Sequence, residues 1–214
     1  KVQNAMNQVV ETKKDGANQS IAAVAIQKNR AGNFEKASEY SGQLEPGKAV
    51  SGSSSFRIGS VSKLMTGLAA HQLYGTRYAS SDGTSKTLSD DTKLIDVFTD
   101  EQLRSMFKDD DLEWGGSITV KQLMDQTSGI SNDEPSEHRE LLNFKSDGTD
   151  RGELPTKAAL FNVCEKGFKL KKETPGVFTY ANVNATLVGA ILETVTNKKF
   201  EDIMKEKIFD PAEM

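Results

Sequence analysis

The sequence predicts an α/β (α+β) protein in which an N-terminal helix and β-hairpin precede a mostly helical region. Residues 1–56 contain one helical stripe of apolar residues, followed by two short runs with the pattern of strands. Residues 57–214 contain longer apolar stripes at helical spacing, separated by polar loops. We therefore expect two parts: residues 1–56, which begin a sheet, and residues 57–214, which are mostly helical.

The first part is predicted to begin with an amphipathic helix over residues 1–14, which ends near Gly16. A strand follows over residues 20–27, where the chain is apolar and partly β-branched. The turn-forming KNRAGN and the alternating segment 34–42 predict a second strand paired with the first. The segment 42–55 is rich in Gly and Ser and is expected to be a connection.

The second part contains several helical patterns. Residues 88–107 indicate a loop and a short helix, and residues 118–130 indicate a helix closed by Gly129. The polar segment 132–155 is either a solvated loop or the border of a pocket. Two C-terminal helices are predicted from two apolar stripes. The first consists of Val183, Leu187, Ala190, Ile191 and Val195, and the second of Phe200, Ile203, Met204 and Ile208.

The composition argues against several classes of function. A net charge of -4 without a basic cluster gives no electrostatic footprint for nucleic acid or for an anionic membrane surface. No apolar run approaches the roughly 18 residues of a membrane span. The single cysteine, Cys164, has apolar neighbours and is expected in the core, with no internal disulfide possible. With only His71 and His138 as histidines, no zinc or other metal site is expected.

The segment FRIGSVSKLMTGLA, residues 56–69, suggests a nucleophile. Ser60 and Lys63 are three positions apart and therefore lie on one face of a helix. A lysine in apolar surroundings has a lowered pKa and can accept a proton, and a helix N-terminus can stabilise an oxyanion. The plainer interpretation is that a serine here caps the helix. Spacing alone does not decide, since Ser105 and Lys108 repeat it within a carboxylate-rich segment that predicts a structural role.

A second segment favours the chemical interpretation. Tyr180 and Asn182 precede an apolar helix in TPGVFTYANVNATLVGAILE, far from Ser60 in the sequence. A phenol at such a junction suits an acid/base group, and a carboxamide suits a hydrogen bond to a substrate amide.

Together these segments resemble the serine β-lactamase and penicillin-binding-protein superfamily, on its class C β-lactamase-like and D-alanyl-D-alanine carboxypeptidase-like branch. FRIGSVSKLMTGLA is similar to the S-x-x-K segment of that family, ITVKQLMDQTSGI to its L-L-x-H-T-S-G segment, and TPGVFTYANVNATLVGAILE to its Y-x-N segment. The order and the spacing of the three also match. The resemblance implies a β-lactamase-like fold, with an antiparallel sheet flanked by helices and a mostly helical region.

The resemblance also implies a role for each site residue. Ser60 would be the acylated nucleophile, Lys63 and Tyr180 would jointly handle its proton, and Asn182 would contact the substrate. The implied reaction is acyl transfer to Ser60 and then to water, with no cofactor.

The sequence departs from the family in three places. Gln126 stands where the family often has histidine, and PAEM at residues 211–214 replaces a commoner P-L-G-M; we expect both to serve packing. Members of the family carry a third motif, K-T-G or H-x-G, on a sheet strand that comes after the point corresponding to residue 214, and the 214 residues do not contain it in that order. We therefore expect this chain to hold only the N-terminal part of the sheet. A C-terminal remainder of the same protein would complete the sheet and the motif.

The predicted function is a serine hydrolase acting on a β-lactam, a D-alanyl peptide or an ester. The sequence does not separate a β-lactamase from a D,D-peptidase or an esterase. The alternative is a catalytically inactive relative that binds peptidoglycan-like or protein ligands in the same cleft. The resemblance implies a periplasmic or secreted protein.

Overall fold

The computed structural model describes residues 21–132, 156–165 and 167–214. The chain divides into two compact units, Lys1–Ile58 and Gly59–Met214. The predicted division into domains after residue 56 stays a prediction. The predicted helix over residues 1–14 and almost all of the polar segment 132–155 lie outside the described residues.

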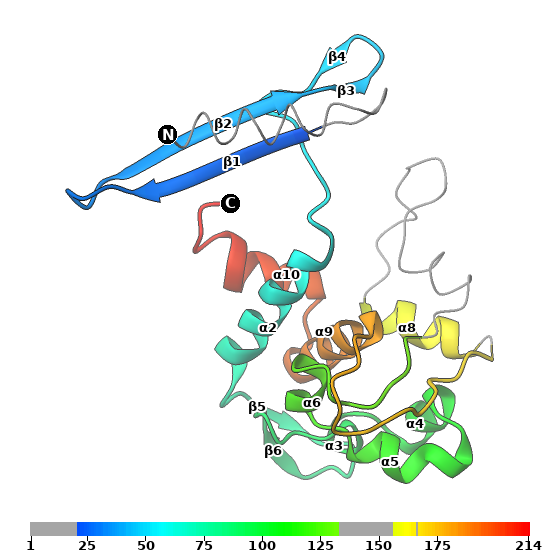
Figure 1. Ribbon diagram of the computed structural model, residues 1–214. Helices are drawn as coiled ribbons and strands as arrows, with labels where there is room; N and C mark the ends of the chain where they lie inside the picture. Colours follow the sequence, from blue (N-terminus) through cyan, green and yellow to red (C-terminus); the bar gives the residue numbers. More distant parts are fainter. Residues whose placement is uncertain (1–20, 133–155, 166) are drawn as a thin grey trace. The chain divides into compact units, whose positions relative to one another are not determined.

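In the first unit, strands β1 (Ile21–Lys28) and β2 (Phe34–Ser41) pair in antiparallel register from end to end (Figure 1). The Asn29 carboxamide stabilises the turn between them, because its Oδ1 accepts hydrogen bonds from the backbone N–H groups of Ala31 and Asn33, at 3.0 Å each. This is the hairpin that the alternating apolar pattern predicts.

One face of this hairpin carries three large apolar side chains that are exposed. Val24, Ile26 and Phe34 share that face by the strand register, and their exposed fractions are 52%, 66% and 73%. Such a face is normally covered by another layer in a stable sheet, because a two-stranded hairpin alone buries little apolar surface.

The segment 42–55 was predicted to be a connection, and that prediction is wrong in part. Strands β3 (Gln43–Glu45) and β4 (Lys48–Ala49) form a second small hairpin within it. Gly47 at the turn has a φ of 84°, which glycine adopts without strain. The strands are too short to give a periodic signal in the sequence.

In its described residues, the second unit consists of helices of 4 to 15 residues and one small hairpin. The hairpin pairs β5 (Arg77–Ala79) with β6 (Ser85–Thr87) in antiparallel register. The helices are α2 (Ser62–Leu73), α3 (Leu94–Val97), α4 (Asp100–Met106), α5 (Leu112–Ser117), α6 (Val120–Met124), α8 (Thr156–Glu165), α9 (Asn182–Thr196) and α10 (Phe200–Met204), with single turns η1 (Gly59–Val61), η2 (Asp109–Asp111) and η3 (Lys205–Phe209).

Helix α9 runs through the core of this unit (Figure 1). It packs against α2, α6, α8 and α10, and ten of its fifteen residues are buried. A helix that is apolar on most sides is stable only at such a central position. The two C-terminal apolar stripes predicted from the sequence are therefore confirmed as core-facing helices. Because α2 and α9 pack side by side, the residues at their N-terminal ends can meet.

Helix α6 is shorter than predicted. Thr119 caps its N-terminus in a capping box with Gln122, but the helix ends at Met124 and not at Gly129. The chain turns because Gln126 adopts a left-handed conformation with a φ of 63°. Gly129 also has a positive φ, of 80°, but it lies in the loop beyond the helix.

Candidate active site

Ser60 and Lys63 meet at the N-terminal end of α2. Ser60 lies in η1, one turn before the helix, and Lys63 is the second residue of α2. The Lys63 Nζ donates a hydrogen bond to the Ser60 Oγ at 3.1 Å. The spacing in the sequence therefore places the hydroxyl and the amine in direct contact.

Tyr180 and Asn182 approach the same two side chains from α9. Tyr180 lies two residues before Asn182, which is the first residue of that helix. The Tyr180 hydroxyl is 2.6 Å from the Ser60 Oγ, and the Lys63 Nζ donates to the Asn182 Oδ1 at 2.7 Å. The Lys63 Nζ also lies 4.8 Å from the centroid of the Tyr180 ring, within the range of a cation–π contact.

The four side chains thus form one connected cluster, although about 120 residues separate its two halves in the chain. Ser60 is exposed and Tyr180 is 40% exposed, whereas Lys63 and Asn182 are half-buried. Among the described residues, no carboxylate forms an ion pair with Lys63. The amine is therefore held by neutral oxygen atoms and an aromatic face. A reactive serine has this arrangement when its proton must pass to a nearby base.

The helix-capping interpretation of the serines does not fit the hydrogen bonds. The N-cap of α2 is Val61, and no side chain there caps the helix. The Ser62 hydroxyl donates to the carbonyl of Gly59 at 2.7 Å. The Ser60 hydroxyl is engaged with Lys63 and Tyr180.

The second S-x-x-K copy has different surroundings. The Ser105 hydroxyl donates to the backbone carbonyl of Gln102, one turn back in α4, at 2.7 Å. No hydrogen bond joins it to Lys108 within the part of the chain that the structure describes. The same spacing thus gives a local backbone bond in α4 and a side-chain cluster at α2.

A buried polar network lies behind the cluster, and the sequence analysis missed it. Gln126 and Ser128 come from the loop after α6, and Asn184 comes from the first turn of α9; all three are buried. The Gln126 Oε1 accepts from the backbone N–H of Ala181 at 2.8 Å and from the Asn184 Nδ2 at 2.9 Å. The Ser128 Oγ donates to the Asn184 Oδ1 at 2.8 Å.

Gln126 was expected to serve packing, and it is buried; in addition, its carboxamide binds the segment that carries the site. The sequence contains one signal for this network: Asn184 is a polar residue within the apolar stripe of α9. A buried carboxamide needs partners, and those partners lie at the site.

The remaining candidates for chemistry are not at the site. Cys164 is buried in the core, and burial raises the pKa of its thiol to about 11, as the prediction of a core cysteine requires. His71 is exposed on α2 and stacks edge-on against Tyr74, while His138 lies outside the described residues. No group of His, Cys, Asp and Glu among the described residues is arranged to hold a metal ion.

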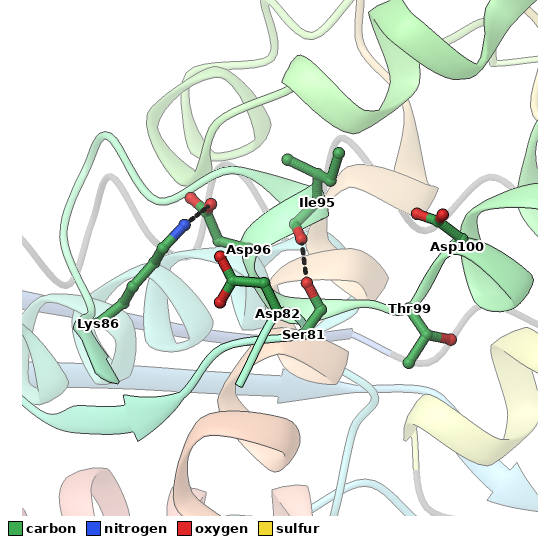
Figure 2. A pocket seen from close by; sticks show the side chains of 7 residues that line it. All are labelled: Ser81, Asp82, Lys86, Ile95, Asp96, Thr99 and Asp100. Atoms are coloured by element: carbon green, nitrogen blue, oxygen red, sulfur yellow. Dashed lines mark hydrogen bonds and ion pairs between the residues drawn. The ribbon is translucent and has the colours of Figure 1, made fainter. Parts of the chain in front are cut away.

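A pocket of about 570 Å³ lies elsewhere in this unit, between the β5–β6 turn and α3 (Figure 2). Two of its three acidic side chains, Asp82 and Asp96, have local structural roles. Asp96 pairs with Lys86 and accepts the backbone N–H of Lys93 at 2.9 Å. Hydrogen bonds from Thr84 lower the pKa of Asp82. None of the four predicted site residues lines this pocket.

Comparison with known proteins agrees with this fold. The chain matches the Beta-lactamase family over residues 6–214 and belongs to that family. Its fold, with small antiparallel sheets and helices, is β-lactamase-like, as the sequence predicts. No curated protein matches the sequence. Among the described residues, no helix combines the length and the hydropathy that a membrane span requires.

Several solved structures share the fold. The octameric penicillin-binding protein homologue from Pyrococcus abyssi is 21% identical, with a TM-score of 0.64 over 100% of this chain and 43% of the other. The D-stereospecific amidohydrolase from Streptomyces sp. is 20% identical, with a TM-score of 0.62 over 99% of this chain and 53% of the other. The D-amino acid amidase from Ochrobactrum anthropi SV3 is 18% identical, with a TM-score of 0.59 over 100% of this chain and 50% of the other. The chain thus spans about half the length of these structures.

Proposed function

We propose that this chain carries the nucleophile of a serine hydrolase that acts through an acyl-enzyme. The observation that carries the proposal is the position of the Ser60 Oγ, 2.6 Å from the Tyr180 hydroxyl and 3.1 Å from the Lys63 Nζ. A serine is a weak nucleophile unless a neighbouring group takes its proton, and both neighbours here are within proton-transfer distance.

The reaction has two acyl-transfer steps. In the first, the Ser60 Oγ attacks the substrate carbonyl carbon, and its proton passes to the Lys63–Tyr180 pair. The bond from that carbon to the leaving nitrogen or oxygen breaks, and the leaving group takes the proton. In the second, water attacks the carbonyl carbon of the ester on Ser60 and gives a proton to the same pair. The bond from that carbon to the Ser60 Oγ breaks, the acid product is released, and the pair returns a proton to the Oγ. Backbone N–H groups at the start of α2 lack helical partners and are suited to stabilise the oxyanion in both steps.

Asn182 has two tasks in this proposal. Its Oδ1 accepts a hydrogen bond from the Lys63 Nζ at 2.7 Å, which holds the amine near Ser60. Its Nδ2 is the donor that we assign to a carbonyl oxygen of the substrate. A carboxamide can do both, because it has an acceptor oxygen and a separate donor nitrogen.

The substrate range is a β-lactam, a D-alanyl peptide or an ester. Two of the similar structures are named as a D-amino acid amidase and a D-stereospecific amidohydrolase. These names favour an amide of a D-amino acid within that range. We also propose that the protein works in the periplasm or outside the cell, where a β-lactamase-like hydrolase would meet such substrates.

The rest of the site is proposed to come from residues outside the 214 of this chain. The exposed apolar face of the β1–β2 hairpin supports this, as does the share of 43% to 53% of the similar structures that the chain spans. Those residues would complete the sheet and supply the K-T-G or H-x-G motif.

The test is covalent labelling of the full-length protein with a penicillin and with a p-nitrophenyl ester, followed by intact mass and by product release. Wild type should gain the acyl mass, and Ser60→Ala should not. Ser105→Ala is the matched control, because it removes the serine of the other S-x-x-K and should label like wild type.

The outcomes separate the alternatives. Rapid penicillin turnover indicates a β-lactamase, a persistent adduct a D,D-peptidase, and turnover of the ester alone an esterase. Equal labelling of Ser60→Ala and wild type would overturn the assignment of the nucleophile. Binding of peptidoglycan fragments without any acylation would instead support the inactive relative.

A further inference from the structure

Gln126 has a backbone conformation that only its surroundings can maintain. Its φ of 63° is left-handed, which is unfavourable for a residue with a side chain. Its side chain is 9% exposed. A strained conformation of this kind persists where neighbouring contacts determine it, and such positions cluster at functional sites. The contacts of Gln126 therefore need an explanation.

These contacts lie on both sides of Tyr180. The backbone carbonyl of Gln126 accepts the N–H of Thr179 at 2.8 Å, and its side-chain Oε1 accepts the N–H of Ala181 at 2.8 Å. One residue thus holds the backbone immediately before and immediately after the phenol. The left-handed turn makes this possible, because it brings the carbonyl and the side chain of the same residue to the same segment.

The segment before Tyr180 has little packing of its own. Val177 and Phe178 are exposed, at 53% and 68%. The phenol itself is 40% exposed, so burial does not fix its position. Its backbone is held by the burial of Ala181 and by the hydrogen bonds on either side of it, both of which go to Gln126.

Gln126 also shares a small cavity with Lys63, the other proton-handling residue. It lines a cavity of about 50 Å³ between α2, α6 and α9, together with Lys63 and Met124.

We propose that Gln126 is a positioning residue, which sets the distance between the Tyr180 hydroxyl and the Ser60 Oγ by holding the backbone on both sides of the tyrosine. This inference rests on the proposed function, since it concerns the same acylation step. It predicts that the loss of the Oε1 acceptor slows acylation without weakening substrate binding, because Gln126 reaches the substrate only through Tyr180.

The test compares acylation of wild type and variants of the full-length protein by a p-nitrophenyl ester, with the rate constant at saturation separated from the substrate dissociation constant. Gln126→Met keeps the length of the side chain but removes the acceptor. We expect its acylation rate constant to fall about 10- to 100-fold, as a displacement of about 1 Å does at other sites, with the dissociation constant unchanged. Gln126→Glu keeps the acceptor oxygen and should restore most of the rate.

Thr119→Ala is the control for stability. It removes the N-terminal cap of α6 and so destabilises the element that precedes Gln126, whereas the side-chain hydrogen bonds of Thr119 in the described part of the chain go to Gln122 and not to the segment around Tyr180. It should lower the melting temperature and leave the acylation rate constant at that of wild type. If Gln126→Met does not fold, Gln126→Asn replaces it, because asparagine tolerates the left-handed conformation and its shorter side chain withdraws the acceptor.

Two results would overturn the inference. One is a folded Gln126→Met or Gln126→Asn that acylates within twofold of wild type. The other is a loss in Gln126→Glu as large as that in Gln126→Met. The proposed function fails separately, if Ser60→Ala is labelled as wild type is, whatever the Gln126 variants do.

Discussion

Tyr180→Phe removes a single oxygen atom from the site and leaves the ring in place. The missing hydroxyl is the group 2.6 Å from the Ser60 Oγ, while the ring 4.8 Å from the Lys63 Nζ remains. A positioned proton-transfer group contributes about 10²- to 10⁴-fold to a rate. The acylation rate constant should therefore fall by that factor, which corresponds to about 3–5 kcal/mol in activation free energy.

Stability and binding should change little in this variant. The Tyr180 side chain is 40% exposed, so the lost hydrogen bond costs about 1 kcal/mol of unfolding free energy or less. Stopped-flow measurement of the p-nitrophenolate burst gives the acylation rate constant and the substrate dissociation constant separately. Because only the first should change, the two quantities distinguish lost chemistry from lost binding.

Tyr78→Phe is the matched control. It makes the same chemical change on β5, at a buried hydroxyl that has no hydrogen-bond partner within the described part of the chain. It should acylate like wild type and be equally or more stable. If Tyr180→Phe acylates within about threefold of wild type, the phenol is not part of the proton-handling pair.

Three further predictions concern the scaffold of the second unit. Glu193→Ala should lower the free energy of unfolding by about 2–4 kcal/mol in a urea titration, because this buried carboxylate accepts hydrogen bonds from N-terminal N–H groups of both α8 and α10. A change below about 0.5 kcal/mol would contradict that role. Gly129→Ala should lower the free energy of unfolding by about 2–5 kcal/mol in the same titration, since the residue has a φ of 80° and a Cβ would lie 2.6 Å from the backbone nitrogen of Pro175. If the variant is as stable as wild type, the loop can move aside and the prediction is wrong. Cys164 should react with iodoacetamide at pH 8 only after unfolding, because burial raises its pKa to about 11, and rapid labelling of the native protein would contradict its place in the core.

The sequence predicts those elements of the fold in which apolar residues recur with a clear period. The alternating β1–β2 hairpin and the long apolar stripe of α9 are where they were expected. The hairpins β3–β4 and β5–β6 were not predicted, because strands of two or three residues have no measurable alternation. The end of α6 was misplaced because contacts from a distant segment hold Gln126 in a left-handed turn, and no local pattern records such contacts.

In the site, too, the contact between residues close in the sequence could be predicted, whereas contacts between residues far apart in the sequence could not be located. The contact between Ser60 and Lys63 follows from helical spacing alone. Their contact with Tyr180 and Asn182 depends on the packing of α2 against α9, which residue types at a loop–helix junction suggest but do not locate. The S-x-x-K at Ser105 has the same spacing and lacks the packing, so spacing alone cannot identify a nucleophile.

Peptide mapping of the acylated protein tests the central claim most directly. The full-length protein is reacted with a penicillin or a p-nitrophenyl ester, quenched in acid, digested, and analysed by tandem mass spectrometry. The proposed mechanism predicts one modified peptide, with the acyl mass on Ser60, and none in Lys63→Met, in which the amine beside the nucleophile is absent. An adduct on Ser105 or any other residue, or labelling of Ser60 at the wild-type rate in Lys63→Met, would contradict it.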